Sequence, residues 1–189
     1  MTTAVLSLGS NMGEPREYLA AAVTTLRPVL ASVSGLYRTP PWGPVPQDDF
    51  LNLTAIVTDD ATDAGGWWRR AQTLEQAAGR RRESRWGPRT LDVDVIAVWQ
   101  RPTGTDRPAR SGEGPTSEYD DVRVPDTEPV ISDDPNLILP HPRAFGRGFV
   151  LVPWAEIQPA AVLPNHGPIV DLIAALDVSG IERVGSLGA

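Results

Sequence analysis

The 189-residue sequence contains no cysteine, and all 17 of its basic residues are arginine, so it contains no lysine either. Without cysteine, neither a disulfide scaffold nor a thiolate metal site can form, and any metal must be held by oxygen or imidazole ligands. Without lysine, the chain lacks the phosphate-binding lysine of a P-loop. A phosphate site would therefore depend on arginine side chains, backbone amides and a bound metal.

Long apolar runs are also missing from the sequence. No stretch approaches the roughly 20 residues that a membrane-spanning helix requires. The start, MTTAVLSLGSN, has neither the basic residues nor the small-residue cleavage site of a signal peptide. We therefore expect a cytoplasmic protein with no membrane partner.

The acidic charge is concentrated in one segment. The formal net charge is −7, and residues 100–135 contain nine acidic residues against four arginines, which accounts for −5 of that charge. An acidic chain is not typical of a general nucleic-acid binder, so we expect no nucleic-acid partner. The same segment is rich in proline and glycine and poor in apolar residues. It is predicted to be an insertion at about 100–135 that adds little core to a single domain spanning residues 1–189.

Outside that segment, the apolar pattern alternates between strand and helix periods. Strands are predicted at 4–8, 33–39, 50–58 and 91–99. One helix follows the GSN turn, and a second runs from an Asp63 N-cap to Ala78. This β-α-β-β-α-β order predicts an α+β, ferredoxin-like core, a mainly antiparallel sheet with its helices packed on one face. C-terminal helices are expected in addition, one of them at 169–176.

Asp92 and Asp94 lie two residues apart in the last predicted strand. Because strand side chains alternate between faces, both carboxylates should project from one face, about 7 Å apart along the chain. Two carboxylates on one face suit Mg²⁺, which prefers hard oxygen ligands. The alternative is an exposed acidic strand, or a pair of partners for nearby arginines.

An arginine-rich segment, GRRRESRWGPRT, comes directly before the two aspartates. It suits a loop that grips a polyphosphate between arginine and metal, and Trp86 could stack on a base there. Gln72 and Glu75 are neighbours on the preceding helix and could meet a ribose hydroxyl. A solvated basic loop and ordinary surface residues are the alternatives. His141, close in sequence to Arg143 and Arg147, could contact phosphate or nucleotide.

Aromatic residues gather around a proline-rich loop, in YRTPPWGP and DFLN. Tyr37 is best explained as a core residue next to a turn. Asn52 is different, because it shares a strand face with Phe50 and must find hydrogen-bond partners if it is buried. An amide can read the edge of a heterocycle, since it offers both donors and an acceptor.

Together, GSN, YRTPPWG, FLN, RWGPRTLDVDV and LPHPR…RGFVLVPWAEI resemble the 6-hydroxymethyl-7,8-dihydropterin pyrophosphokinases of folate biosynthesis. The resemblance covers residues 1–99 and about 136–180. It implies a ferredoxin-like fold, an enzyme that is expected to be a monomer, and transfer of pyrophosphate from ATP to the pterin hydroxymethyl group with release of AMP. The transfer would be an in-line attack on the β-phosphorus.

The resemblance also implies roles for individual residues. Two Mg²⁺ ions would be held by Asp92 and Asp94, with Arg80 and Arg89 as the other catalytic residues, and Arg81 or Arg82 joining them at the phosphates. The remaining nucleotide contacts would be Gln72, Glu75, Trp86, His141 and Arg147. The pterin pocket would comprise Thr39, Pro40, Trp42, Gly43, Phe50, Asn52 and Phe149, with the two phenylalanines sandwiching the ring.

Three features depart from the family pattern. The loop from Gly79 to Trp86 is one residue shorter than expected, so Arg81 and Arg82 are alternatives for one role. Asn136 and Ile138 stand where a basic residue and a hydroxyl would contact the nucleotide. The acidic insertion has no counterpart in short members. An RNA-binding ferredoxin-like module and a Mg²⁺-dependent nucleotidyltransferase are the alternative functions.

Overall fold

The computed structural model describes residues 1–42, 46–79, 87–102 and 127–187. Its sheet has the strand order β11-β3-β4-β1-β5-β6, and β2 also pairs with β4. All pairings in it are antiparallel. The strands are β1 (Thr2–Ser10), β2 (Leu30–Val33), β3 (Leu36–Thr39), β4 (Phe50–Asp59), β5 (Asp92–Gln100), β6 (Glu128–Pro129) and β11 (Glu182–Gly185). The inner order β3-β4-β1-β5 is that of a ferredoxin-like core, which confirms the predicted fold class.

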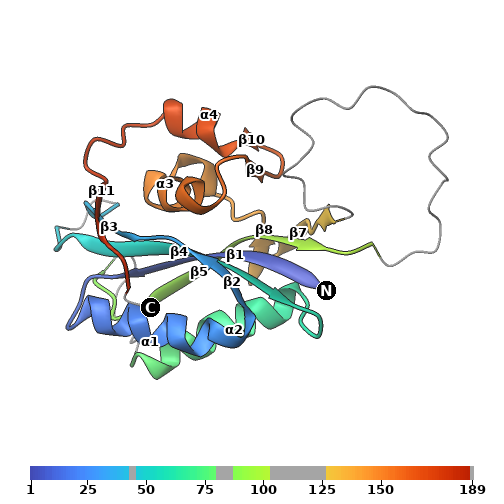
Figure 1. Ribbon diagram of the computed structural model, residues 1–189, viewed down its shortest axis with the longest axis horizontal. Helices are drawn as coiled ribbons and strands as arrows, with labels where there is room; N and C mark the ends of the chain where they lie inside the picture. Colours follow the sequence, from blue (N-terminus) through green and yellow to red (C-terminus); the bar gives the residue numbers. More distant parts are fainter. Residues whose placement is uncertain (43–45, 80–86, 103–126, 188–189) are drawn as a thin grey trace.

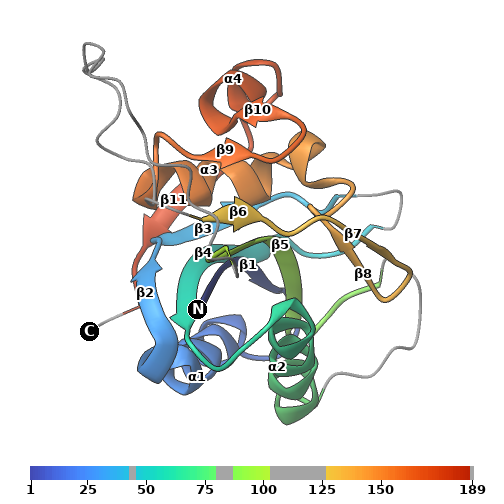
Figure 2. The same ribbon diagram turned by 90° about the vertical axis from the view of Figure 1, so that its right-hand side faces the viewer.

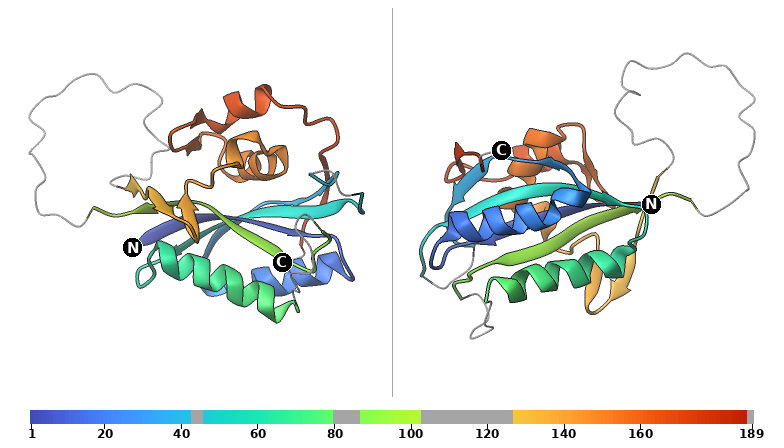
Figure 3. Two further views of the ribbon diagram at one scale, coloured as in Figure 1. Left: turned by 180° about the vertical axis from the view of Figure 1, so that it is seen from behind. Right: turned by 60° about the horizontal axis from the view of Figure 1, so that its bottom comes forward.

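Helices cover both faces of this sheet (Figure 1), and Figure 2 shows the same layers from the side. On one face lie α1 (Pro15–Leu26) and α2 (Ala64–Ala77), which run side by side in the right-hand view of Figure 3. On the other lie α3 (Gly148–Ile157) and α4 (Ile169–Ala174). The shorter elements are η1 (Arg27–Val29), β7 (Ser132–Asp134), β8 (Leu137–Leu139), η3 (Ala144–Gly146), β9 (Val162–Leu163) and β10 (Gly167–Pro168). No helix among the described residues is long and apolar enough to cross a membrane.

Alternate side chains of the central strand β1 enter two separate cores. Leu6 and Leu8 pack with α1 and α2, whereas Val5 packs with α3 on the opposite face. Each fully buried side chain of this size contributes about 1.5–3 kcal/mol. Trp67 of α2 is fully buried, and its indole Nε1 donates to Thr2 Oγ1 at 2.9 Å. α2 packs mainly against β5, and the bond from Trp67 ties it to the start of β1.

The predicted strand at 33–39 was wrong as a single element, because the chain breaks between β2 and β3. Ser34 leaves the strand to bond with Thr54, which donates its amide to Ser34 Oγ at 2.9 Å. Gly35 N donates instead to Glu156 Oε2 at 2.8 Å. The Asp63 N-cap is confirmed, since its Oδ1 accepts from Gly66 N at 2.6 Å.

Glu156 of α3 connects three parts of the fold. Besides the amide of Gly35, its carboxylate accepts from the Tyr37 hydroxyl at 3.0 Å and from Arg183 Nε of β11 at 3.0 Å. Burial and the hydrogen bond to Glu156 raise the pKa of Tyr37 to about 12. Burial alone would raise the pKa of Glu156, but its three hydrogen-bond donors outweigh that effect and lower it.

Part of the segment predicted as an insertion belongs to the sheet. β6 pairs with the end of β5, and Val130 N donates to Val98 O at 2.8 Å. β7 pairs with β8 in a hairpin beside β5. Residues 103–126 of the predicted insertion lie outside the described residues.

Candidate active site

The floor of the site is formed by the small residues of β1. Gly9 pairs with Asn52 of β4 on one side and with Asp92 of β5 on the other. Since neighbouring strands lie about 4.8 Å apart, Asn52 and Asp92 stand roughly 10 Å from each other across Gly9. Ser7 in the same way separates Thr54 from Asp94. A Cβ atom at Gly9 would overlap the Asn52 amide oxygen, so only glycine fits there without a shift.

A first cavity lies above this floor, on the α3 side of the sheet. Asn52 is 4% exposed, and its Nδ2 donates to Thr39 Oγ1 at 2.7 Å. The other lining residues come from the start of β4, the first turn of α3 and the loop after β3. They include Pro40, Trp42, Gln47, Phe50 and Phe149. Asp92 and Asp94 also line this cavity.

A second cavity reaches the same carboxylates from another direction. Its walls are one face of α2 and the hairpin strand β8 with the turn before it, and they include Trp68, Gln72, Glu75, Asn136 and Ile138. Four residues line both cavities: Arg89, Asp92, Asp94 and His141. The two cavities therefore meet at the carboxylate pair.

Each carboxylate of the pair has an arginine partner. Arg89 forms an ion pair with Asp92, and Arg147 Nη1 lies 2.8 Å from Asp94 Oδ2. The Arg147 side chain is only 7% exposed, and its guanidinium lies 5.1 Å from the ring centre of Trp42. The same guanidinium lies 5.5 Å from the ring of Phe149. The two carboxylates share a face, as the strand alternation predicted. The two arginines offset the repulsion between them.

The imidazole of His141 lies beside the carboxylates. Burial lowers its pKa, and the charges of Arg147 and Arg143 add to this, although Asp94 acts in the opposite direction. Its Nδ1 accepts from the Arg143 amide at 3.2 Å, which leaves the proton on Nε2, 3.8 Å from Asp94 Oδ2. The main chain is fixed as well, because His141 N donates to Ile96 O at 2.7 Å.

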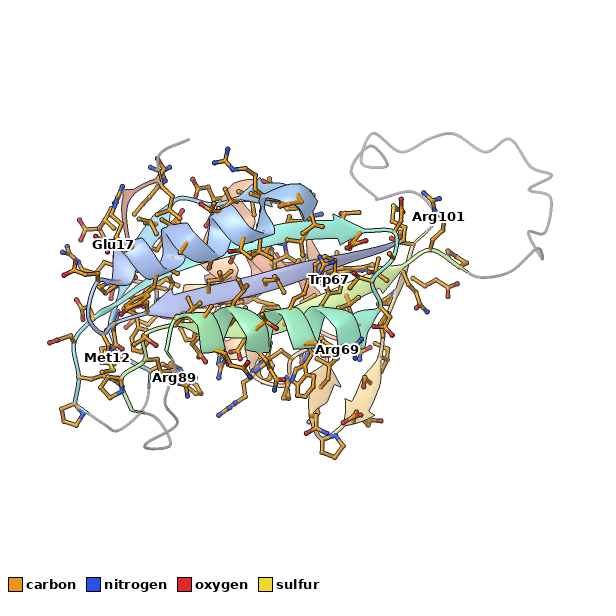
Figure 4. All side chains as sticks on the ribbon, turned by 90° about the horizontal axis from the view of Figure 1, so that it is seen from below. Met12, Glu17, Trp67, Arg69, Arg89 and Arg101 are labelled. Atoms are coloured by element: carbon orange, nitrogen blue, oxygen red, sulfur yellow. The ribbon has the colours of Figure 1, made fainter. Side chains whose placement is uncertain are left out.

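Asn11 connects the loops that border the site, a role that the sequence did not reveal. Its Oδ1 accepts from the Arg89 amide at 2.8 Å, and its Nδ2 donates to Gln47 Oε1 and to Asp48 O, both at 3.0 Å. The amide of Met12 donates to Arg89 O at 3.2 Å. Figure 4 accordingly shows Met12 and Arg89 together at one end of the sheet, opposite Arg101.

Glu75 lies inside the protein and not on the surface of α2. It is 6% exposed, and its Oε1 accepts from Val93 N at 3.0 Å. Val93 is the residue between the two aspartates, so Glu75 holds their strand against α2. Gln72, one turn earlier on the helix, is half-buried in the second cavity.

The residues at the junction fit a magnesium site. No group of three or more potential ligand side chains occurs among residues 1–42, 46–79, 87–102 and 127–187. Mg²⁺ is usually bound by one or two carboxylates, with substrate phosphates and water completing its shell. Asp92 and Asp94 offer that number of carboxylates at a point where two cavities meet.

Residues 5–159 match the family model of 7,8-dihydro-6-hydroxymethylpterin-pyrophosphokinase, abbreviated HPPK. The chain belongs to the HPPK family. A 2-amino-4-hydroxy-6-hydroxymethyldihydropteridine pyrophosphokinase of Mycobacterium tuberculosis is 39% identical over 97% of this chain and 89% of that protein. The proteins of the same name from Mycobacterium leprae and Methylorubrum extorquens are 42% and 38% identical, over 98% and 97% of this chain and 87% and 99% of their own lengths.

Solved structures support the HPPK fold. A Plasmodium falciparum HPPK-DHPS chain superposes with a TM-score of 0.58 at 12% identity, over 92% of this chain. This chain spans 45% of that longer protein. At this identity the likeness concerns the fold alone.

Most residues that the sequence assigned to the HPPK site line one of the two cavities. Gly43, Arg80, Arg81, Arg82 and Trp86 lie outside the described residues, so their assignments remain predictions. Asn136 and Ile138, noted as departures from the family pattern, line the second cavity. Ser7, Gly9, Asn11 and Trp68 also border the site and were not predicted from the sequence. A signal for the first two was present, because small residues alternate with leucine in LSLG.

Proposed function

We propose that this HPPK transfers the terminal diphosphate of ATP to the hydroxymethyl oxygen of 6-hydroxymethyl-7,8-dihydropterin, and releases AMP. Family membership supports a pyrophosphokinase of folate biosynthesis. The observation that carries the detailed proposal is the meeting of two differently lined cavities at one carboxylate pair. Such a junction brings an acceptor and a donor to the same point from two sides, which is the requirement of a direct group transfer.

The first cavity has the chemistry to hold a pterin. The Asn52 amide lies at one end and the carboxylates at the other, about 10 Å away across the floor of β1. A flat fused ring would lie between Phe50 and Phe149, with its edge at Asn52 and its hydroxymethyl group at the aspartates. Trp42 and Thr39 complete this wall, and Pro40 and Gly43 are proposed to border the ring.

The second cavity would hold ATP. Gln72 and Glu75 stand on its α2 wall, and His141 stands at the junction. His141 can donate to a phosphate oxygen from Nε2, because its Nδ1 accepts from the Arg143 amide. In the proposal, Arg89 and Arg147 move from the carboxylates to the phosphates, where Arg80 and either Arg81 or Arg82 join them. Trp86 is proposed as a further nucleotide contact.

Asp92 and Asp94 would hold Mg²⁺, for which we propose two ions. Bound Mg²⁺ supplies neutralisation of the phosphate charge at this point. The hydroxymethyl oxygen forms a bond to the β-phosphorus, while the bond between the β-phosphorus and the oxygen that bridges it to the α-phosphorus breaks. The electron pair leaves with AMP, and the hydroxyl proton is lost to solvent. Positioning and charge neutralisation suffice, and no covalent intermediate with the protein is involved.

Exclusion of water would depend on the loops that border the site. Asn11 connects the loop ending at Asp48 with the loop ending at Arg89. Loops that close together over both substrates would keep water from competing with the pterin hydroxyl for ATP.

The single-domain organisation, the acidic insertion and the monomeric state remain predictions.

The test is to incubate the protein with ATP, Mg²⁺ and 6-hydroxymethyl-7,8-dihydropterin. AMP and the pterin diphosphate should appear in equal amounts and only when all three are present. Omission of the pterin is the control, because it reports hydrolysis of ATP.

The products also separate this proposal from a nucleotidyltransferase that uses the same acid pair. That enzyme would release pyrophosphate and attach AMP to its acceptor. Mass analysis of the pterin product distinguishes an added diphosphate from an added AMP, and the second result would overturn the proposal.

A further inference from the structure

The chain after α4 runs to β11, which lies at the edge of the sheet beside β3 (Figure 1). Residues 178–183, which lead into this strand and begin it, are called the C-terminal segment below. All of them belong to the described part of the chain, and none of them lines either cavity. They also lie beyond residues 5–159, which match the HPPK family model. The C-terminal segment nevertheless packs against two parts of the chain that form the first cavity.

The first of these contacts is with the start of α3. A Cβ atom placed on Gly148 would lie 2.8 Å from Ile181 Cδ1 and 3.1 Å from Val178 Cγ1, so both apolar side chains lie close against the helix backbone. Gly148 is the first residue of α3, and the next residue, Phe149, lines the first cavity. Because packed groups cannot move independently, the place of Phe149 depends on Ile181.

The second contact is with the loop after β3. A Cβ atom placed on Gly180 would lie 3.1 Å from Pro40 Cγ and 3.2 Å from Pro40 Cδ, so the chain passes directly against the proline ring. Pro40 lines the first cavity, and it follows Thr39, which accepts the hydrogen bond of Asn52. A turn closed by Ile181 N, which donates to Val178 O at 2.9 Å, brings Gly180 and Ile181 to their two contacts together.

Arg183 fixes the end of the C-terminal segment. Its Nε lies 3.0 Å from Glu156 Oε1 of α3, and a Cβ atom on Gly35 would lie 2.7 Å from the same nitrogen. Glu156 in turn accepts from the Tyr37 hydroxyl of β3. The Arg183 side chain is 52% exposed, so this ion pair contributes less than about 1 kcal/mol to stability. Its main effect is to hold the segment against both α3 and β3.

We propose that the C-terminal segment positions the pterin pocket, and that Ile181 is a positioning residue of this enzyme. Ile181 acts on Phe149 through Gly148, and Gly180 acts on the opposite part of the pocket through Pro40. The inference rests on the proposed function, in which the pterin lies between Phe50 and Phe149. Stacked rings attract each other only near contact distance, so a small shift of Phe149 weakens pterin binding.

The nucleotide should be affected much less than the pterin. None of residues 178–183 contributes to the second cavity, where ATP is proposed to bind. Arg147, which precedes Gly148, is held from another direction by its bond to Asp94. A change at Ile181 should therefore separate the affinities of the two substrates, whereas general damage to the fold would lower both.

The test titrates 6-hydroxymethyl-7,8-dihydropterin by calorimetry into protein saturated with Mg²⁺ and α,β-methylene-ATP, whose bond at the reacting position is not cleaved. Ile181→Ala should weaken pterin binding about 10-fold, because the contact with Gly148 is lost. Its binding of α,β-methylene-ATP, measured separately, should stay within about twofold of the wild type. Ile181→Leu, which keeps the side-chain volume, should restore pterin binding to within about threefold.

Two further variants separate positioning from stability. Gly180→Ala presses a Cβ atom against Pro40, and it should weaken pterin binding several-fold; the φ of Gly180 lies outside the left-handed region, so alanine adds no backbone strain. Val23→Ala opens a cavity in the other core, beneath α1, and serves as the matched control. It should lower the thermal midpoint at least as much as Ile181→Ala, and it should leave pterin binding unchanged.

The inference is overturned if Ile181→Ala binds the pterin as the wild type does. It is also overturned if Ile181→Ala loses affinity equally for pterin and nucleotide, or if Val23→Ala weakens pterin binding as much, because the loss would then follow stability alone. A wild-type protein that binds no pterin would refute the proposed function and this inference with it. Pterin binding by the wild type without formation of the pterin diphosphate would refute the proposed function alone.

Discussion

Replacing Asp94 with alanine should destabilise the protein as well as inactivate it. Arg147 is 7% exposed at its side chain, and its Nη1 lies 2.8 Å from Asp94 Oδ2. Its Nε is buried and has no hydrogen-bond partner among the described residues. The substitution leaves this guanidinium inside the protein without its counter-charge, next to the rings of Trp42 and Phe149.

The size of the effect follows from the burial of the two partners. Removing one member of a fully buried ion pair costs about 3–5 kcal/mol. Because the Asp94 side chain is 32% exposed, water can partly replace it, and we expect about 2–3 kcal/mol. For a chain of this size, such a loss lowers the thermal midpoint by roughly 5–10 °C. Asp92→Ala is the matched control, since its partner Arg89 is 29% exposed and the loss should stay under about 1 kcal/mol.

The assay is urea denaturation in EDTA, without nucleotide, so that neither metal nor substrate contributes. A double-mutant cycle with Arg147→Met isolates the pair, because Asp94→Ala should cost little once the guanidinium is gone. We expect a coupling free energy of about 2 kcal/mol. Additive effects in the cycle, or equal losses of stability for Asp94→Ala and Asp92→Ala, would show that the Arg147–Asp94 pair does not stabilise the fold in this way.

Activity gives an independent check on Asp94. If this carboxylate holds Mg²⁺, Asp94→Ala should lower turnover by at least about 100-fold and weaken binding of MgATP, because charge neutralisation at the phosphates is reduced. A variant that retained wild-type turnover would contradict the metal assignment.

Two further predictions concern the floor of the site and the pH dependence of folding. Gly9→Ala should weaken pterin binding by about 10-fold, because the new Cβ displaces the Asn52 amide; calorimetry measures this, and Gly146→Ala, where a Cβ meets no neighbour, should have no effect. The pKa of Tyr37 is raised to about 12, so its contribution to the free energy of unfolding should be fully present below about pH 10 and lost as the pH rises from about 10 to 12. Tyr37→Phe should remove this pH dependence, which urea denaturation at several pH values measures. The lowered pKa of Glu156 predicts that its contribution to the free energy of unfolding is lost as the pH falls below about 4.5 through its folded pKa. Glu156→Gln should remove this loss, and a variant with the same acid dependence as the wild type would contradict the prediction.

The sequence predicted helices and strands well where its apolar residues followed a single period, that of a helix or that of a strand. The alternation in LDVDV placed both aspartates on one face, and the Asp63 N-cap was identified from its residue type and position. α3 was not predicted as a helix, because GFVLVPWAEI is apolar on most of its surface and gives little helical periodicity. The break at Ser34 was missed for a different reason, since its cause is a hydrogen bond to Thr54, twenty residues away.

Three features can be read from the sequence: a carboxylate pair on one strand face, basic residues that are all arginine, and the motifs of the HPPK family. Which of these groups meet depends on the folded arrangement of the chain. Arg147 reaches Asp94 across 53 residues, and Trp68 and Ile138 line one cavity from a helix and a hairpin. The physical reason is that side-chain direction within a strand or helix follows from local backbone geometry, whereas partners far apart in sequence are fixed only by the packing of the whole chain.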